Sequence, residues 1–191
     1  MTAAVPGRWR RWFVWGVAPA VVVLVAALAV AHRPWLEAWW PGRHEAATLP
    51  SACPRLPGLP PGSPARLTGP GGVEGADCVW AGSPEVEARY WLYRRTGTSS
   101  GTGEAQREAA SRVTRYAGPS AGYTLGADTP LSGVGDEARI SAHGSLVVLV
   151  ARKSNVVLVL DRTSAPDEGT EQAEAAAIGD ARTLLDLVEL S

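Results

Sequence analysis

The sequence predicts an α+β fold, an antiparallel sheet with helices packed on one face, preceded by a single N-terminal transmembrane helix. Strand-like alternation and short apolar runs occur between residues 78 and 160, and helical periodicity occurs at 104–116 and 171–190. Because the predicted strands are grouped, with helices in the middle and at the end, an antiparallel sheet is favoured. An uncharged apolar run from Phe13 to Ala31 predicts the transmembrane helix.

The first predicted element is a membrane span over residues 12–32. A helix of about 20 apolar residues crosses a hydrocarbon core about 30 Å thick, and this run has that length. Arginines precede the span, so the positive-inside rule places residues 1–11 in the cytoplasm and the rest of the chain outside. The lipid bilayer is therefore an expected partner. Tryptophans, which favour the headgroup region, flank both ends of the span: Trp9, Trp12, Trp15, Trp35, Trp39 and Trp40.

A cleaved signal peptide is the alternative for the same segment. Small residues at Ala29 and Ala31 form a cleavage pattern after a basic region, and cleavage near Ala31 would give a secreted protein. The apolar run is longer than the usual signal core of about 7 to 15 residues, which favours an uncleaved anchor. Both alternatives place the remainder of the chain outside the cytoplasm.

Residues 33–70 are rich in tryptophan and proline and are predicted to be an extended stem, followed by an extracytoplasmic domain over 71–191. Cys53 and Cys78 lie on the outer side, where a disulfide persists, and their pairing would tie the stem to the domain. Two free buried thiols are the alternative. No metal site is expected, because the three histidines lack the spacing of zinc ligands: His32, His44 and His143.

The charge of the outer part argues against a nucleic-acid partner. Residues 51–191 carry 12 arginines and one lysine against 17 acidic residues, a net charge of about −4. The basic residues are scattered rather than gathered in a patch that would follow a phosphate backbone. No motif indicates a cofactor.

Within the domain, short strands are predicted at Cys78–Trp80 and Val86–Leu92, the second with a clear period of two. A helix over 104–116 follows, then a strand at Arg139–Ala142. Leu146–Ala151 and Val156–Leu160 form a hairpin joined by residues 152–155; these strands are apolar at almost every position and should be covered on both faces. A final helix is expected over 171–190.

Two glycine motifs resemble functional signatures but lie in the wrong context. Residues 118–122 match the G-x-S-x-G pattern with Ser120, yet a helix precedes this serine where a nucleophile elbow requires a strand. Residues 133–138 resemble a dinucleotide fingerprint, yet a strand follows where a helix N-terminus is needed. A loop after a helix and a glycine-permitted bend are the favoured interpretations.

The candidate ligand or partner surface consists of charged and aromatic side chains, each with a structural alternative. Trp91 and Tyr93 share a strand face with Arg89 and suit a sugar or peptide, although packing under the helices is favoured because large aromatics bury most area. Asp136 and Glu137 are adjacent, and neighbouring side chains on a strand diverge, which favours a solvated turn. The remaining candidates are expected at an exposed hairpin tip, with an anion contact as the alternative: Arg152 and Lys153.

The order of these features resembles the small extracytoplasmic domains of actinobacterial cell-envelope proteins. The most specific part is the Gly-Val-Gly-Asp-Glu-Ala sequence at 133–138 before an apolar hairpin that bears Arg-Lys-x-Asn at 152–155. Such domains occur in secreted or lipid-anchored proteins of unknown function and in the outer sensor domains of membrane serine/threonine kinases. The resemblance implies a disulfide-linked, non-catalytic α+β domain that binds ligands or partners. This chain lacks the lipid-attachment cysteine and the kinase domain.

The sequence therefore predicts a membrane-anchored extracytoplasmic domain with a binding or sensory role at the cell envelope and no enzymatic activity. An accessory or scaffold subunit of a membrane protein complex is the second hypothesis, because small residues in the span permit close packing against another helix. A small envelope serine hydrolase, which rests only on Ser120, is the remote third.

Overall fold

In the described part of the chain, a seven-stranded antiparallel sheet and two α-helices form the fold, which confirms the predicted α+β class. The computed structural model describes residues 45–97, 99–117 and 128–190. The strands lie in the order β1-β2-β3-β7-β6-β5-β4, and every neighbouring pair is antiparallel. Along the chain the elements are β1 (Ser63–Thr68), the short 3-10 turn η2 (Pro70–Gly72), β2 (Glu74–Trp80), β3 (Val86–Leu92), α2 (Gly101–Ala117), β4 (Thr129–Leu131), β5 (Glu137–His143), β6 (Leu146–Lys153), β7 (Val156–Thr163) and α3 (Thr170–Asp186).

The β6–β7 hairpin occupies the middle of the sheet and supplies core residues to both of its faces. Val157 and Val159 belong to one apolar cluster, whereas Val156, Leu158 and Leu160 belong to the other. This division follows from the period of two along a strand. The prediction that these strands are covered on both faces is confirmed.

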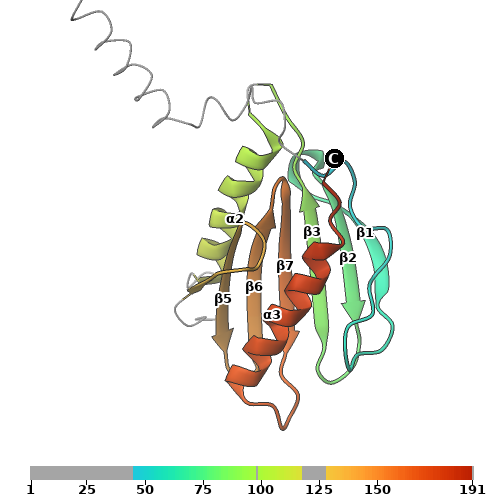
Figure 1. Cartoon of the computed structure of the whole chain (residues 1–191), viewed down its shortest axis with the longest axis vertical. Coiled ribbons are helices and arrows are strands. Elements are labelled where there is room, and N and C mark those ends of the chain that lie inside the picture. The colour runs from blue at the N-terminus through green and yellow to red at the C-terminus, as the bar shows by residue number, and fades with distance from the viewer. Residues whose placement is uncertain (1–44, 98, 118–127, 191) are drawn as a thin grey trace, which may run out of the picture. The chain divides into compact units, whose positions relative to one another are not determined.

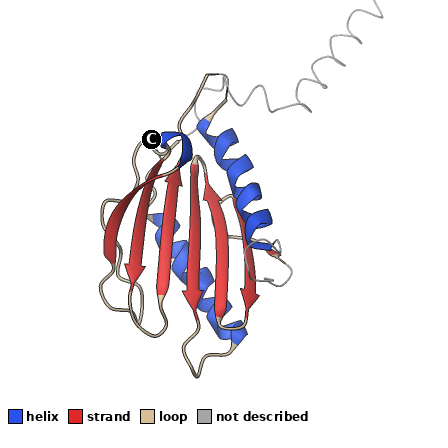
Figure 2. Cartoon of the chain, turned by 180° about the vertical axis from the view of Figure 1, so that it is seen from behind, coloured by secondary structure: helices blue, strands red, loops and turns tan. Residues whose placement is uncertain are grey.

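The two helices lie on opposite faces of the sheet, so the prediction that both pack on one face was wrong. α3 buries Ala177, Ala181 and Leu184 against the cluster that contains Leu158, and Figure 1 shows it crossing in front of the central strands. In the reverse view of Figure 2, α3 passes behind the strands. α2 instead packs Ala105 against the cluster that contains Val157. A strand pair that is apolar on both faces needs a cover on each, which the pattern of either helix alone does not reveal.

The sheet begins earlier than the predicted domain boundary at residue 71. Ser63–Thr68, which was predicted to belong to the extended stem, is the edge strand β1 and pairs with β2. Pro64 is compatible with an edge strand, where one backbone N–H is not needed for pairing. Residues before β1 also contribute to the core, since Leu49 and Leu56 are buried. The compact unit that contains the sheet starts at His44.

Several element boundaries differ from the predicted ones for local reasons. α2 begins at Gly101 rather than residue 104, because Ser100 Oγ accepts the Gly103 N–H at 3.1 Å in the manner of a helix cap. β2 starts four residues before Cys78, and β5 starts at Glu137 rather than Arg139. The three-residue strand β4 was not predicted at all. α3 ends at Asp186 instead of residue 190.

The predicted membrane span at residues 12–32 lies outside the described residues. Within the part of the chain that the structure describes, no helix is both long enough and apolar enough to cross a membrane.

Candidate functional site

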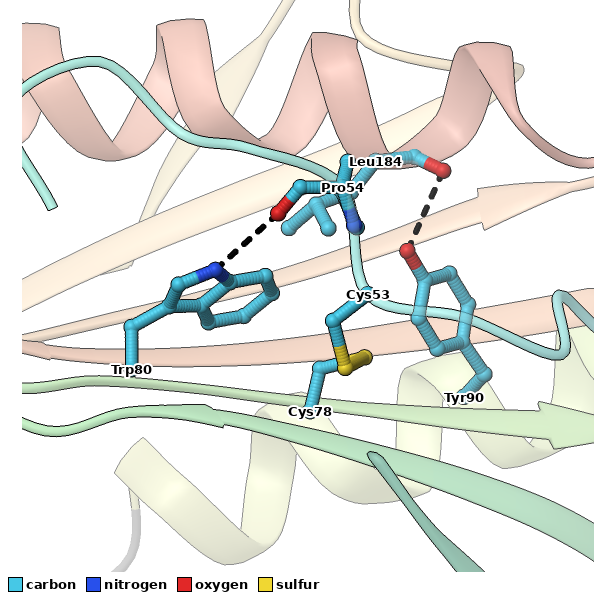
Figure 3. Close-up of a disulfide and its surroundings, with 6 residues drawn as sticks. All are labelled: Cys53, Pro54, Cys78, Trp80, Tyr90 and Leu184. Atoms are coloured by element: carbon cyan, nitrogen blue, oxygen red, sulfur yellow. Dashed lines mark hydrogen bonds between the residues drawn. A yellow bond between two sulfur atoms is a disulfide. The ribbon is translucent and has the colours of Figure 1, made fainter. Parts of the chain in front are cut away.

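The predicted disulfide between Cys53 and Cys78 is present, and it fastens the segment before β1 to β2. The Cα atoms of the two cysteines are 5.6 Å apart, which is a normal separation for a disulfide. Figure 3 shows the bridge between two buried aromatic residues of the sheet. Trp80 Nε1 donates to Pro54 O at 3.1 Å, and the Tyr90 hydroxyl donates to Leu184 O at 3.2 Å. The strands thereby hold both the proline-rich segment and α3.

Trp91 and Tyr93 lie on the α2 face of the sheet, with the apolar cluster that contains Ala105. The guanidinium of Arg112, from α2, sits 4.9 Å from the centre of the Trp91 ring, a cation–π distance. Burial raises the pKa of the Tyr93 hydroxyl above its usual value of 10.0. Gly75 leaves room for the indole, because a Cβ there would lie 2.8 Å from the ring. The placement of both rings agrees with the packing alternative.

Arg89, the third candidate on this strand face, lies among carboxylates. Its guanidinium forms an ion pair with Asp161 on β7 and a second, at 3.3 Å, with Glu87. Asp77 is Arg89's register partner on β2. Burial raises the pKa of Asp161 above 3.8, and the positive charge of Arg89 opposes this effect. Arg89 is thus tied into the sheet by neighbouring acids.

The raised pKa of Asp161 predicts a pH-dependent contribution to stability. As the pH falls from neutral toward 3.8, the Asp161 carboxyl takes up a proton in the folded protein at a higher pH than in the unfolded chain. Protonation of this group therefore increases the free energy of unfolding over this pH range. Asp161→Asn should remove this gain. Denaturant unfolding of both proteins across this range should show the wild type gaining stability relative to the variant as pH falls. A difference that shrinks or stays constant contradicts the assignment.

Asp136, Glu137 and Arg152 meet at one end of β5 and β6. Arg152 Nη1 donates to Asp136 Oδ2 at 2.9 Å, and its Nε donates to Glu137 Oε2 at 3.1 Å. Two predictions are corrected here. Arg152 is buried rather than at an exposed hairpin tip, since its side chain is only 10% exposed. The two carboxylates converge rather than diverge, because Asp136 precedes β5 in a turn that Gly135, with φ of 60°, permits.

Lys153 lies on the other side of the sheet from Arg152, as expected for the next residue of a strand. Its Nζ donates to Leu185 O at 2.8 Å and to Val188 O at 3.1 Å. A cation that binds the carbonyls at a helix C-terminus stabilises that end, and α3 ends here. The expectation of an exposed tip is therefore also wrong for Lys153.

A groove with a volume of about 380 Å³ lies beside α2, along β4 and β5. Small and apolar side chains form much of its lining, and charged or amide groups form the rest. The lining residues are Gln106, Ala109, Ala110, Val113, Pro130, Leu131, Asp136, Glu137, Ala138, Arg139 and Val150. Of the predicted surface residues, the groove brings together Asp136 and Glu137. Arg89, Trp91, Tyr93, Arg152 and Lys153 are not part of its lining.

Sequence reasoning missed most of the groove. The sequence did contain one indication of close packing between α2 and the sheet. Ala105 and Ala109 lie one turn apart on α2, and small residues let a helix approach a sheet closely. Arg139 was seen only as a strand residue, although it lines the groove and pairs with Asp128.

Asn155 was also missed, and it holds the segment that precedes the domain. This residue is 2% exposed, and the segment that it holds is the part of the compact unit before β1. Its Oδ1 accepts the Ala46 N–H at 2.7 Å, while its Nδ2 donates to Ala46 O at 3.1 Å and to Tyr93 O at 2.9 Å. Glu45 next to Ala46 accepts two hydrogen bonds from Thr102 at the start of α2. The hairpin turn therefore anchors the chain where it enters the sheet domain.

Replacing Asn155 by alanine is expected to lower the free energy of unfolding by about 2 kcal/mol or more, because the buried backbone groups of Ala46 and Tyr93 lose their partners. Amide hydrogen exchange at Ala46 should accelerate more than exchange in the middle of β7. Urea unfolding measures the change in the free energy of unfolding, and amide hydrogen exchange shows which part of the chain has lost protection. Unchanged protection at Ala46 would show that Asn155 does not hold this segment.

Within the described residues, the remaining motifs do not assemble a catalytic or metal site. Ser120 and the rest of residues 118–122 lie outside the described residues. Asp128 pairs with Arg139, and His143 is exposed at the end of β5. Among the described residues, no three His, Cys, Asp or Glu side chains are grouped so as to hold a metal ion.

The fold and the site define a disulfide-linked α+β domain with a lateral groove. Comparison of the chain with protein-family models, with curated proteins and with solved structures finds no match.

Proposed function

We propose that the chain is a single-pass membrane protein whose extracytoplasmic domain binds a ligand at the cell envelope without catalysing a reaction. The apolar run at 13–31 and the arginines before it support the anchor and its direction. The Cys53–Cys78 bridge supports an oxidising compartment for the domain. The ligand site in this proposal is the groove beside α2.

The groove is the observation that carries the binding proposal. Its volume of about 380 Å³ falls within the range of small-molecule sites, which combine an apolar lining with a few polar groups. Ala109, Val113 and Val150 provide the apolar part, and Asp136, Glu137 and Arg139 provide the polar groups. A ligand with an apolar body of a few carbon atoms, or a short segment of a peptide, suits this lining.

The test uses two matched substitutions of exposed helix alanines. Ala110 lines the groove, whereas Ala175 lies on α3 outside it. The full chain, in lipid nanodiscs, is titrated with 2-phenylethanol, and the amide resonances of the groove residues are followed. We expect saturable shifts at Ala109 and Val150 in the wild type and in Ala175→Trp, and their loss in Ala110→Trp, whose indole fills the groove. Shifts that persist in Ala110→Trp, or their absence from the wild type, contradict the proposal.

A further inference from the structure

We propose that the ligand of the groove carries a positive charge, which is held at the end formed by Asp136 and Glu137. This inference rests on the proposed binding function of the groove and adds the chemical class of the ligand. It is drawn from the charges that line the groove and from how each charge is already paired.

The Asp136–Glu137 end keeps an uncompensated negative charge. Both carboxylates bind the guanidinium of Arg152, which supplies one positive charge for two negative ones. Arg152 is buried on its side of the pair, with its side chain 10% exposed, whereas those of Asp136 and Glu137 are 50% and 48% exposed. The arginine therefore fixes the carboxylates from within the protein while they remain accessible to a ligand.

The contacts of Asp136 show how its carboxylate is held. Its Oδ2 accepts hydrogen bonds from Arg152 and from the Ser154 N–H at 2.7 Å. Both of these hydrogen bonds reach the same oxygen, and the Asp136 side chain as a whole is 50% exposed. Because Oδ2 is held by two donors, the carboxylate is oriented before any ligand arrives, which reduces the entropy lost on binding.

The other charged group of the groove is already neutralised. Arg139 pairs with Asp128, so it does not offer an unopposed positive charge to an anion. Arg139 and Glu137 are two residues apart on β5 and therefore lie on the same face of this strand, while the lining beside them includes apolar side chains such as Ala109, Val113 and Leu131. Charge complementarity thus favours a cationic head next to Glu137 and an apolar body along α2, whereas a ligand carboxylate at that end would face two carboxylates.

Three probes with the same phenylethyl body and different heads test the inference. These are 2-phenylethyltrimethylammonium, neutral 2-phenylethanol and anionic 3-phenylpropanoate. Titrated into the full chain in nanodiscs and followed at the amide of Ala109, the cation should bind at least about threefold more tightly than the alcohol, the gain expected of one half-exposed ion pair. The anion should bind most weakly.

Glu137→Gln should reduce the preference for the cation over the anion at low salt, while Asp167→Asn, which removes an exposed charge outside the groove, should leave it unchanged. Equal affinities, or a preference for the anion, would overturn the inference and leave the binding function of the groove intact. Failure of all three probes to shift groove resonances would overturn the binding function itself. If Glu137→Gln does not fold, the order of the three affinities measured on the wild type decides whether the groove prefers a cation.

Discussion

Replacing Arg162 by methionine is expected to lower the free energy of unfolding by about 3–5 kcal/mol, the usual cost of breaking a buried ion pair from one side. Arg162, on β7, donates to Glu168 at 2.9 Å and to Asp180 of α3 at 3.3 Å. All three side chains are at most 10% exposed. Methionine fills a similar volume but leaves two buried carboxylates without their cation.

Arg66→Met is the matched control, because Arg66 lies on the edge strand β1 with its side chain 58% exposed and pairs with Glu74 only at 3.7 Å. Exposed pairs contribute about 0–1 kcal/mol, so this variant should unfold close to the wild type. Urea denaturation of the three proteins at neutral pH measures both effects. Equal losses from the two substitutions would mean that the buried network does not stabilise the contact between β7 and α3.

Removal of the disulfide by Cys53→Ala with Cys78→Ala is expected to cost about 3.5 kcal/mol. The bridge joins residues 25 positions apart, and a closed loop of this length lowers the entropy of the unfolded chain by about that amount. Leu49 and Leu56, on either side of Cys53, are buried. Without the disulfide this segment can detach from the sheet, and both side chains then become exposed in partly unfolded states.

Reducing agent supplies the control for this prediction. The wild type treated with a phosphine reductant should unfold at nearly the same denaturant concentration as the double variant, and the variant itself should not respond to the reductant. A double variant within about 1 kcal/mol of the oxidised wild type would contradict the expected contribution.

The parts of the fold that were predicted correctly are those in which local pattern and burial coincide. Val86, Ala88 and Tyr90 alternate with polar residues because β3 buries one face completely, and the period of two is visible in the sequence. The hairpin of Leu146–Ala151 and Val156–Leu160 was predicted because both strands are apolar at almost every position, and in the structure its strands extend to Lys153 and Thr163. The disulfide was predicted because both cysteines lie in the part of the chain expected outside the cytoplasm, where a disulfide persists.

The parts that were missed depend on contacts between distant residues. An Arg-Lys pair before a hairpin turn has the composition of an exposed tip, and only the approach of Asp136 and Glu137 shows that Arg152 is buried. The same holds for Asn155, whose partner Ala46 is 109 residues away. β1 was missed because proline-rich composition indicates coil, while pairing with β2 determines its actual conformation.

The candidate site was only half visible for the same reason. Asp136 and Glu137 stood out as an acidic pair, but the groove they border exists because α2 packs over β6 and β7 and leaves β5 beside it. Sequence periodicity identifies a helix and its apolar stripe without saying which strands it covers. The site is therefore located by the packing of α2 on the face of the sheet opposite to α3, which the sequence pattern did not predict.

The intact mass of the protein from fractionated cells, alkylated without prior reduction, tests the membrane-anchored extracytoplasmic domain most directly. We expect recovery in the membrane fraction, without loss of residues 1–31 from the 20.0 kDa chain, and no alkylation of Cys53 or Cys78 until a reductant is added. A soluble chain that begins near His32 would contradict the anchor. Alkylation of both cysteines in unreduced protein would contradict the oxidising compartment.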